Sequence, residues 1–258
     1  MAELQWNDIV RPPTTASQAR LELAAVCRLA ARENIAPIGA SRFATRDPER
    51  PGTYLINSGG LLLVEVCASN LIAVDRDGVR LDDGIAEPDA GALALVLASL
   101  EAKPEAVAAA QVATTAGCAV ASLKDGLLPI TQTSFMFHGA LGTYDWEAMA
   151  AADTLRQGIA AEMNNCSAVL VRGRGLLVAG DTLAQAWKFL FFLNKCCRSQ
   201  IDAMAAAKGA GASLTMPTKA VIDHAVAQSR AFIEHPRYVA DWPSALEQLD
   251  REDPSYRD

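Results

Sequence analysis

The segment Phe189–Leu193 is apolar at five consecutive positions, inside a helix that the sequence predicts from Leu183 to about Lys208. A helix that is apolar on every side must be covered on every side. The chain must therefore either fold a core around this stretch or cover it with another subunit. With 258 residues, 51% of them hydrophobic, the chain has enough apolar material for a core of this size.

Helical stretches and short apolar runs alternate along the rest of the chain. Apolar spacing and boundary residues predict helices over Ser17–Arg32, Pro88–Ala102, Ala116–Leu123 and Asp153–Met163. Strands are expected over Tyr54–Asn57, Leu62–Val66, Leu71–Asp75, Val107–Val112, Ala168–Arg172 and Leu176–Ala179, and a turn-rich segment over Gly39–Gly52. This order predicts one α/β domain over residues 1–258, with a core at about 18–208 and a helical and irregular tail at 209–258.

Composition excludes several classes of protein. A net charge of -7 does not favour nucleic acid, which requires a basic face. No apolar run approaches the roughly 20 residues that span a bilayer, and Met1–Pro13 lacks the apolar segment of a signal peptide. We expect a soluble, cytoplasmic protein without a membrane or nucleic-acid partner. The six cysteines form no C-x-x-C pair and are expected to be reduced packing residues.

Several short phrases stand in a characteristic order: Arg46–Pro48, Leu55–Asn57, Gly60–Leu61, Glu65–Leu71, Gly126–Ile130, Gly175–Leu177, Gly180–Thr182 and Asp253–Arg257. Over roughly residues 18 to 205, this order resembles the class II aldolase/adducin family. The resemblance implies a three-layer α/β/α domain with a central, mostly antiparallel sheet. It also implies a homo-oligomer, with a tetramer as the favoured state.

The resemblance further implies a divalent metal held by three histidines, two from an H-x-H pair and one from an N-H-G turn. Here the H-x-H segment aligns with Gln111-Val112-Ala113, and the turn with Gly173-Arg174-Gly175. All three ligand positions are changed, and His138, His224 and His235 stand elsewhere. We therefore expect no metal and no cofactor. Arg42 replaces a further histidine of the family's early phrase, and the acidic proton-transfer residue of the aldolases falls near Gly91.

Family geometry implies that Arg42 and Arg174 face the former metal pocket. Two guanidiniums there suit a carboxylate held in bidentate fashion, or an enolate that develops during reaction. Gln111 would orient a substrate carbonyl through its amide. The alternatives are that each arginine pairs with a nearby acid and that Gln111 bonds backbone at a strand end. Arg46 is interpreted as structural.

The remaining candidates each have a structural alternative. His138 and Tyr144, in a segment that continues to Trp146 and Glu147, are candidates for proton transfer, with a surface loop and interface packing as alternatives. In relatives this segment approaches the pocket from the neighbouring subunit. Asn57, Ser58 and Gly59 resemble an anion-holding loop but are also typical of a plain turn. Tyr256 either covers the pocket or docks the tail.

These residues predict a metal-independent enzyme of lyase or cyclase type. Its chemistry would be carbon–carbon bond formation or cleavage, or decarboxylation. The substrate would be a small carboxylate-bearing carbonyl or an amino-acid-derived compound. Two alternatives remain open: a non-catalytic, adducin-like interaction module, and a metal-dependent aldolase with relocated ligands.

Overall fold

A seven-stranded sheet forms the centre of the protein, whose computed structural model describes residues 10–36, 41–83, 90–145 and 152–258. The strands are β1 (Arg42–Arg46), β2 (Tyr54–Ile56), β3 (Ile72–Val74), β4 (Ala108–Val112), β5 (Leu141–Asp145), β6 (Ala168–Arg172) and β7 (Gly175–Gly180). Their order is β3-β2-β1-β4-β7-β6-β5. Only the β5–β6 pair is parallel, so the prediction of a mostly antiparallel sheet is confirmed.

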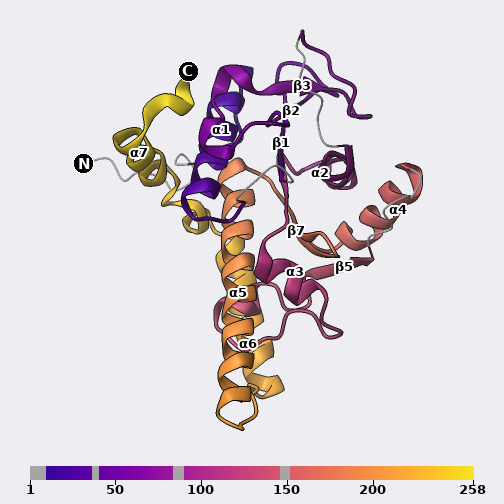
Figure 1. The fold of residues 1–258 in the computed structure, drawn as a ribbon, viewed down its shortest axis with the longest axis vertical. Helices are drawn as coiled ribbons and strands as arrows, with labels where there is room; N and C mark the ends of the chain where they lie inside the picture. Colours follow the sequence, from indigo (N-terminus) through magenta and orange to yellow (C-terminus); the bar gives the residue numbers. More distant parts are fainter. Residues whose placement is uncertain (1–9, 37–40, 84–89, 146–151) are drawn as a thin grey trace.

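Helices cover both faces of this sheet (Figure 1). They are α1 (Ala16–Arg32), α2 (Ala90–Ala102), α3 (Thr115–Ala121), α4 (Ala152–Met163), α5 (Leu183–Gly209), α6 (Lys219–Glu234) and α7 (Trp242–Glu252). One core joins alternate strand residues to α1, α3 and α5, and the other joins the remaining strand residues to α2 and α4. The three-layer α/β/α prediction is confirmed.

Strand β4 shows how tertiary packing overrides local propensity. Most of its residues are alanine, a poor strand former, yet all five residues of the strand are buried. Ala108 and Ala110 pack in one core, while Ala109 packs in the other. Small side chains let helices approach both faces of this central strand.

Two predicted segments are wrong. The turn expected over Gly39–Gly52 contains β1, which pairs with both β2 and β4. Its arginine-rich sequence is typical of a surface segment, whereas Arg42 is buried in the structure. The strand expected over Leu62–Val66 is instead a 3₁₀ turn, Leu63–Glu65; Leu62 before it and Val64 within it are exposed. A strand over Leu141–Asp145 was not expected, since only Gly142 of it is fully buried.

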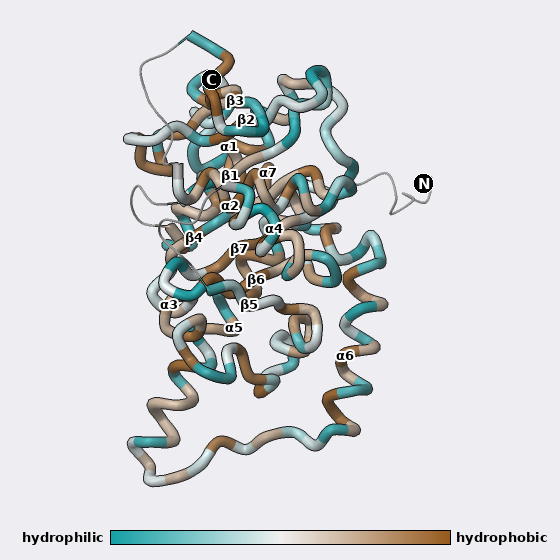
Figure 2. The backbone as a smooth tube through the Cα atoms, turned by 90° about the vertical axis from the view of Figure 1, so that its right-hand side faces the viewer, coloured by the Kyte–Doolittle hydropathy of each residue, from teal (hydrophilic) through white to brown (hydrophobic). Residues whose placement is uncertain are grey.

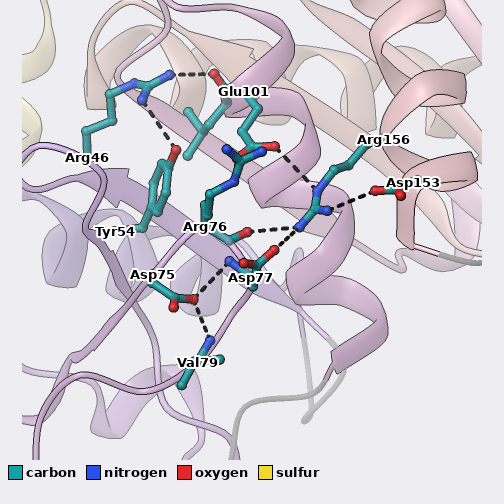
Figure 3. A network of polar contacts seen from close by, with 10 residues as sticks. Arg46, Tyr54, Asp75, Arg76, Asp77, Val79, Glu101, Asp153 and Arg156 are labelled. Carbon is teal, nitrogen blue, oxygen red and sulfur yellow. Dashed lines mark hydrogen bonds and ion pairs between the residues drawn. The ribbon is translucent and has the colours of Figure 1, made fainter.

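Polar anchors fix α2 and α4 against the sheet (Figure 3). Arg46 donates to the carbonyl oxygens of Leu100, in the last turn of α2, and of Ala106, between α2 and β4. Its guanidinium lies over the ring of Tyr54. This agrees with the interpretation of Arg46 as structural. On α4, Arg156 forms ion pairs with Glu101 of α2 and with Asp77, which lies in the turn after β3.

The predicted long helix is present as α5, and its apolar stretch is largely enclosed. Phe189, Leu190 and Leu193 are buried, whereas Phe191 and Phe192 are partly exposed. The end of α5 and the connection to α6 extend well away from the sheet (Figure 2). Of the helices in the described part of the chain, none is long and apolar enough to cross a membrane.

Candidate functional site

Arg42 and Gln111 lie directly opposite each other in the β1–β4 ladder. Directly opposed residues have Cβ atoms about 5 Å apart on one face of the sheet. Ala44 and Ala109, two residues away on each strand, belong to the core beneath α2 and α4, so Arg42 and Gln111 share that face. Their exposed fractions are only 2% and 0%.

Arg174 joins this pair through its main chain. It lies in the tight turn between β6 and β7, where Gly173 and Gly175 have positive φ values of 74° and 93°. The Nε2 atom of Gln111 donates to the Arg174 carbonyl oxygen at 2.7 Å. Register and this hydrogen bond therefore bring together Arg42, Gln111 and Arg174, the three residues named from the sequence, at one end of the sheet.

Each of these side chains also has partners within the chain. The Arg42 Nη1 atom donates to the Ser41 carbonyl oxygen at 3.0 Å. Arg42 and Arg174 both take part in further polar interactions, so neither guanidinium is free. The Oε1 atom of Gln111 is buried and has no hydrogen-bond partner in the described part of the chain.

The Asn57–Gly59 loop follows β2 at the same end of the sheet. Asn57 is buried, and both ends of its amide are used: Oδ1 accepts from the Phe43 amide at 2.8 Å, and Nδ2 donates to the Ser41 carbonyl at 3.2 Å. The side chain of Asn57 thus extends the β1–β2 ladder and fixes the start of β1, which corrects its expected role as a ligand contact. Ser58 donates to the Gly59 carbonyl at 3.0 Å, within the turn.

The two proton-transfer candidates lie at opposite ends of β5. Tyr144 pairs with Val171 near the Arg174 turn, and its ring packs over Gly158 of α4. His138 is exposed and precedes Leu141, at the far end of the strand. Within one chain, His138 therefore does not reach the arginines, and only a second copy of the chain would bring it there. Trp146 and Glu147 lie outside the described residues.

Tyr256 lies on the other side of the sheet, which corrects the expectation that it covers the pocket. It is 0% exposed, packs in the core of α1 and α5, and donates from its hydroxyl to Asp250 at 2.7 Å. Arg28 of α1 holds the adjoining residues, with bonds to Asp253 at 2.9 Å and Ser255 at 3.0 Å. Tyr256 is therefore a docking residue of the tail.

The ligand positions that the family resemblance implies do not fit a divalent metal here. Ala113 has no donor atom, and one N–H of Gln111 is committed to the Arg174 carbonyl. A guanidinium stays protonated and repels a dication. Within the described ranges, no three His, Cys, Asp or Glu side chains gather as a metal-binding group. No catalytic step is therefore assigned to a metal.

Cys118 borders the site and was read from the sequence only as a packing residue. It lies on α3, where a Cβ built on Gly175 would be 3.4 Å from its Sγ atom. Burial raises the pKa of the Cys118 thiol, and the positive charge of Arg174 opposes that rise. No local sequence signal marks this neighbour, because only the turn geometry brings the two residues together.

Comparisons with known proteins agree with the fold and the motifs. The model of the Class II Aldolase and Adducin N-terminal domain matches residues 21–201. A putative aldolase class 2 protein of Caulobacter vibrioides is 30% identical over 241 residues, which are 93% of this chain and 92% of that protein. Human gamma-adducin is 27% identical over 193 residues, which cover 74% of this chain but 27% of gamma-adducin.

A crystal structure of an aldolase II superfamily protein from Pseudomonas syringae superimposes with a TM-score of 0.86 at 32% identity. The match covers 98% of this chain and 99% of that one, so it includes the α5–α6 extension and the tail. Domain match, sequence identity and fold lead to one conclusion: this chain belongs to the class II aldolase and adducin family.

Proposed function

We propose that the Arg42–Gln111–Arg174 end of the sheet binds a small carboxylate-bearing carbonyl compound or an amino-acid-derived one. We further propose that the chain is a metal-independent lyase or cyclase. The observation that carries this is the pairing of Arg42 with Gln111, both buried, where Gln111 stands at a position that the family resemblance gives to a metal ligand. Burying a permanent cation costs free energy of desolvation, and a bound anion at this position would offset that cost.

The chemistry follows from where charge develops. When a carbon–carbon bond beside a carbonyl breaks, its electron pair moves into the carbonyl group as an enolate. A fixed guanidinium stabilises that negative charge, more strongly in a buried site than in water. Arg42 and Arg174 would hold the carboxylate and the enolate oxygen. Tyr144 of the same chain, or His138 of a second copy, would transfer the proton.

A non-catalytic, adducin-like interaction module is the second candidate. It is favoured by the use of Gln111 as an internal tether for Arg174 and by the further polar interactions of both arginines. Such a module would bind no small carboxylate at this position. A metal-dependent aldolase with relocated ligands is the third candidate, and stoichiometric Zn, Mn or Fe in the purified protein would support it.

Binding of a simple 2-oxo acid distinguishes these candidates. We expect chelator-treated protein to bind pyruvate in a ligand-observed NMR titration. Arg42→Met and Arg174→Ala should each weaken that binding by about tenfold or more, because a charge-assisted hydrogen bond is lost. Arg251→Met is the matched control, since Arg251 is exposed on α7 and pairs only loosely with Glu247. Equal binding by wild type and both site variants would overturn the proposed function.

A further inference from the structure

The nitrogen and the oxygen of the Gln111 side-chain amide differ in their hydrogen bonding. The Nε2 atom donates to the Arg174 carbonyl oxygen, while the buried Oε1 atom has no partner among the described residues. A buried acceptor without a partner carries a desolvation penalty, and folded proteins leave only a few such groups. The sequence predicts that the Gln111 amide orients a substrate carbonyl, and a carbonyl would need the N–H end of that amide. The end of the amide that lacks a partner is instead the oxygen.

The orientation of this amide is fixed by its neighbour. Rotating the amide by 180° would place Oε1 against the Arg174 carbonyl oxygen, setting two acceptors face to face at 2.7 Å. The oxygen therefore stays on the side away from the Arg174 carbonyl.

Gln200 provides an internal comparison. It is also 0% exposed, but both of its ends are bonded: Oε1 accepts from the Leu128 amide at 2.6 Å, and Nε2 donates to the Gly126 carbonyl at 2.9 Å. In Gln200, a buried glutamine thus has both ends satisfied. Glu22 Oε2, Asn194 Oδ1 and Tyr238 Oη are also buried without a hydrogen-bond partner in the described part of the chain, but of these acceptors Gln111 Oε1 belongs to the residue that lies directly opposite a buried arginine in a strand ladder.

The pairing of a cation with an acceptor selects among ligands. A carboxylate suits Arg42, but a ligand that presents only acceptor atoms leaves Oε1 without a hydrogen bond. A hydrogen-bond donor next to the carboxylate provides that bond. An ammonium group would supply the donor, but it would be repelled by the guanidinium of Arg42, so a neutral hydroxyl fits better.

We infer that Gln111 Oε1 accepts a hydrogen bond from a hydroxyl group adjacent to the ligand's carboxylate, so that the site prefers 2-hydroxy carboxylates to their 2-deoxy counterparts. This inference rests on the proposed function, because it requires that Arg42 binds the carboxylate. A site that hydrogen-bonds a substrate hydroxyl discriminates strongly against analogues that lack it.

Matched ligand pairs test the inference on the full chain. The dissociation constants of lactate and propionate, and of malate and succinate, would be measured by ligand-observed NMR. Lactate and malate should bind about tenfold or more tightly than their partners that lack the hydroxyl. Gln111→Met should bring each ratio close to one while propionate and succinate still bind. Gln200→Met, the matched control, should leave the ratios unchanged.

The outcomes separate the two proposals. Arg42→Met should weaken all four ligands, which tests carboxylate binding alone. If the wild type binds all four acids without preference, or Gln111→Met keeps the preference, the hydroxyl inference fails while the proposed function stands. If the wild type binds none of the four acids, the hydroxyl inference fails, and the proposed function fails with it only if pyruvate does not bind either. Should Gln111→Met be unfolded by circular dichroism, the wild-type ratios still decide.

Discussion

At the residue scale, the turn that carries Arg174 depends on its two glycines for different reasons. Both have positive φ, a region that residues with a Cβ rarely adopt. A Cβ on Gly173 would meet nothing within 4 Å. A Cβ on Gly175 would lie 2.5 Å from the Val112 carbonyl oxygen and 3.1 Å from the Cα of Ala113. Gly175 thus lets the turn approach the end of β4, so that Gln111 reaches the Arg174 carbonyl.

Alanine substitutions distinguish the two glycines. Gly173→Ala should lower the free energy of unfolding by about 1 kcal/mol, the cost of the left-handed conformation alone. Gly175→Ala should lower it by about 3 kcal/mol or more, since a backbone atom cannot move aside as a flexible side chain can. Urea unfolding monitored by circular dichroism measures both. Equal losses for the two variants would contradict the close approach of the turn to β4.

At the element scale, the C-terminal 3₁₀ turn Pro254–Arg257 is held to α1 and α7 by charges. The hydrogen bonds from Arg257 and then Tyr256 lower the pKa of Asp250 to about 2. An unperturbed aspartate titrates near pH 4. Because the folded pKa is the lower one, ionised Asp250 stabilises docking above about pH 4, and this contribution is lost as the pH falls through about 2.

The docking of the tail should therefore depend on pH only in the acid range. Amide hydrogen exchange over residues 242–258, corrected for intrinsic rates, should be unchanged between pH 7 and 5. It should accelerate between about pH 4 and 2. Asp250→Asn should show the fast exchange already at pH 5, while Asp223→Asn on α6 serves as a control. Protection that persists in Asp250→Asn at pH 5 would show that packing of Tyr256 alone suffices.

At the scale of the whole molecule, α6 is a helix that the rest of the chain covers poorly. None of its side chains is classed as buried, and it packs mainly against the turns Thr133–Met136 and Pro236–Val239. Val221 and Phe232 are 52% and 51% exposed, and their spacing of eleven residues places them on one face of the helix. A helix of 16 residues is marginal in water without such cover. The expected homo-oligomer would supply it.

Light scattering coupled to size exclusion tests this prediction. The measured mass of the wild-type protein should be an integer multiple, two or more, of the mass of one chain. Val221→Asp should shift the population toward the single chain, because a charge would be buried in the interface. Ala227→Asp, an exposed position on another side of α6, should leave the mass unchanged. A wild-type protein with the mass of one chain would refute the homo-oligomer.

The predicted secondary structure was accurate where the pattern was periodic and failed where charge interrupted it. The helices α1, α4 and α5 and the strands β4, β6 and β7 begin or end within a few residues of their expected bounds. Strand β1 was missed because Arg42 and Arg46 mark a surface segment by composition, whereas main-chain carbonyls accept hydrogen bonds from both side chains. Strand β5 was missed because only Gly142 of its five residues is fully buried, so the segment shows no apolar alternation.

The order of motifs determined the family and the layer architecture. Those properties follow from short-range patterns and their spacing, which a linear sequence contains in full. Only the tertiary structure decided what each residue does with its hydrogen bonds. Asn57 anchors a strand, and Tyr256 docks the tail. The buried Oε1 atom of Gln111 has no hydrogen-bond partner among the described residues. The reason is physical: hydrogen bonding depends on which groups from distant strands meet, and register sets that only when the sheet forms.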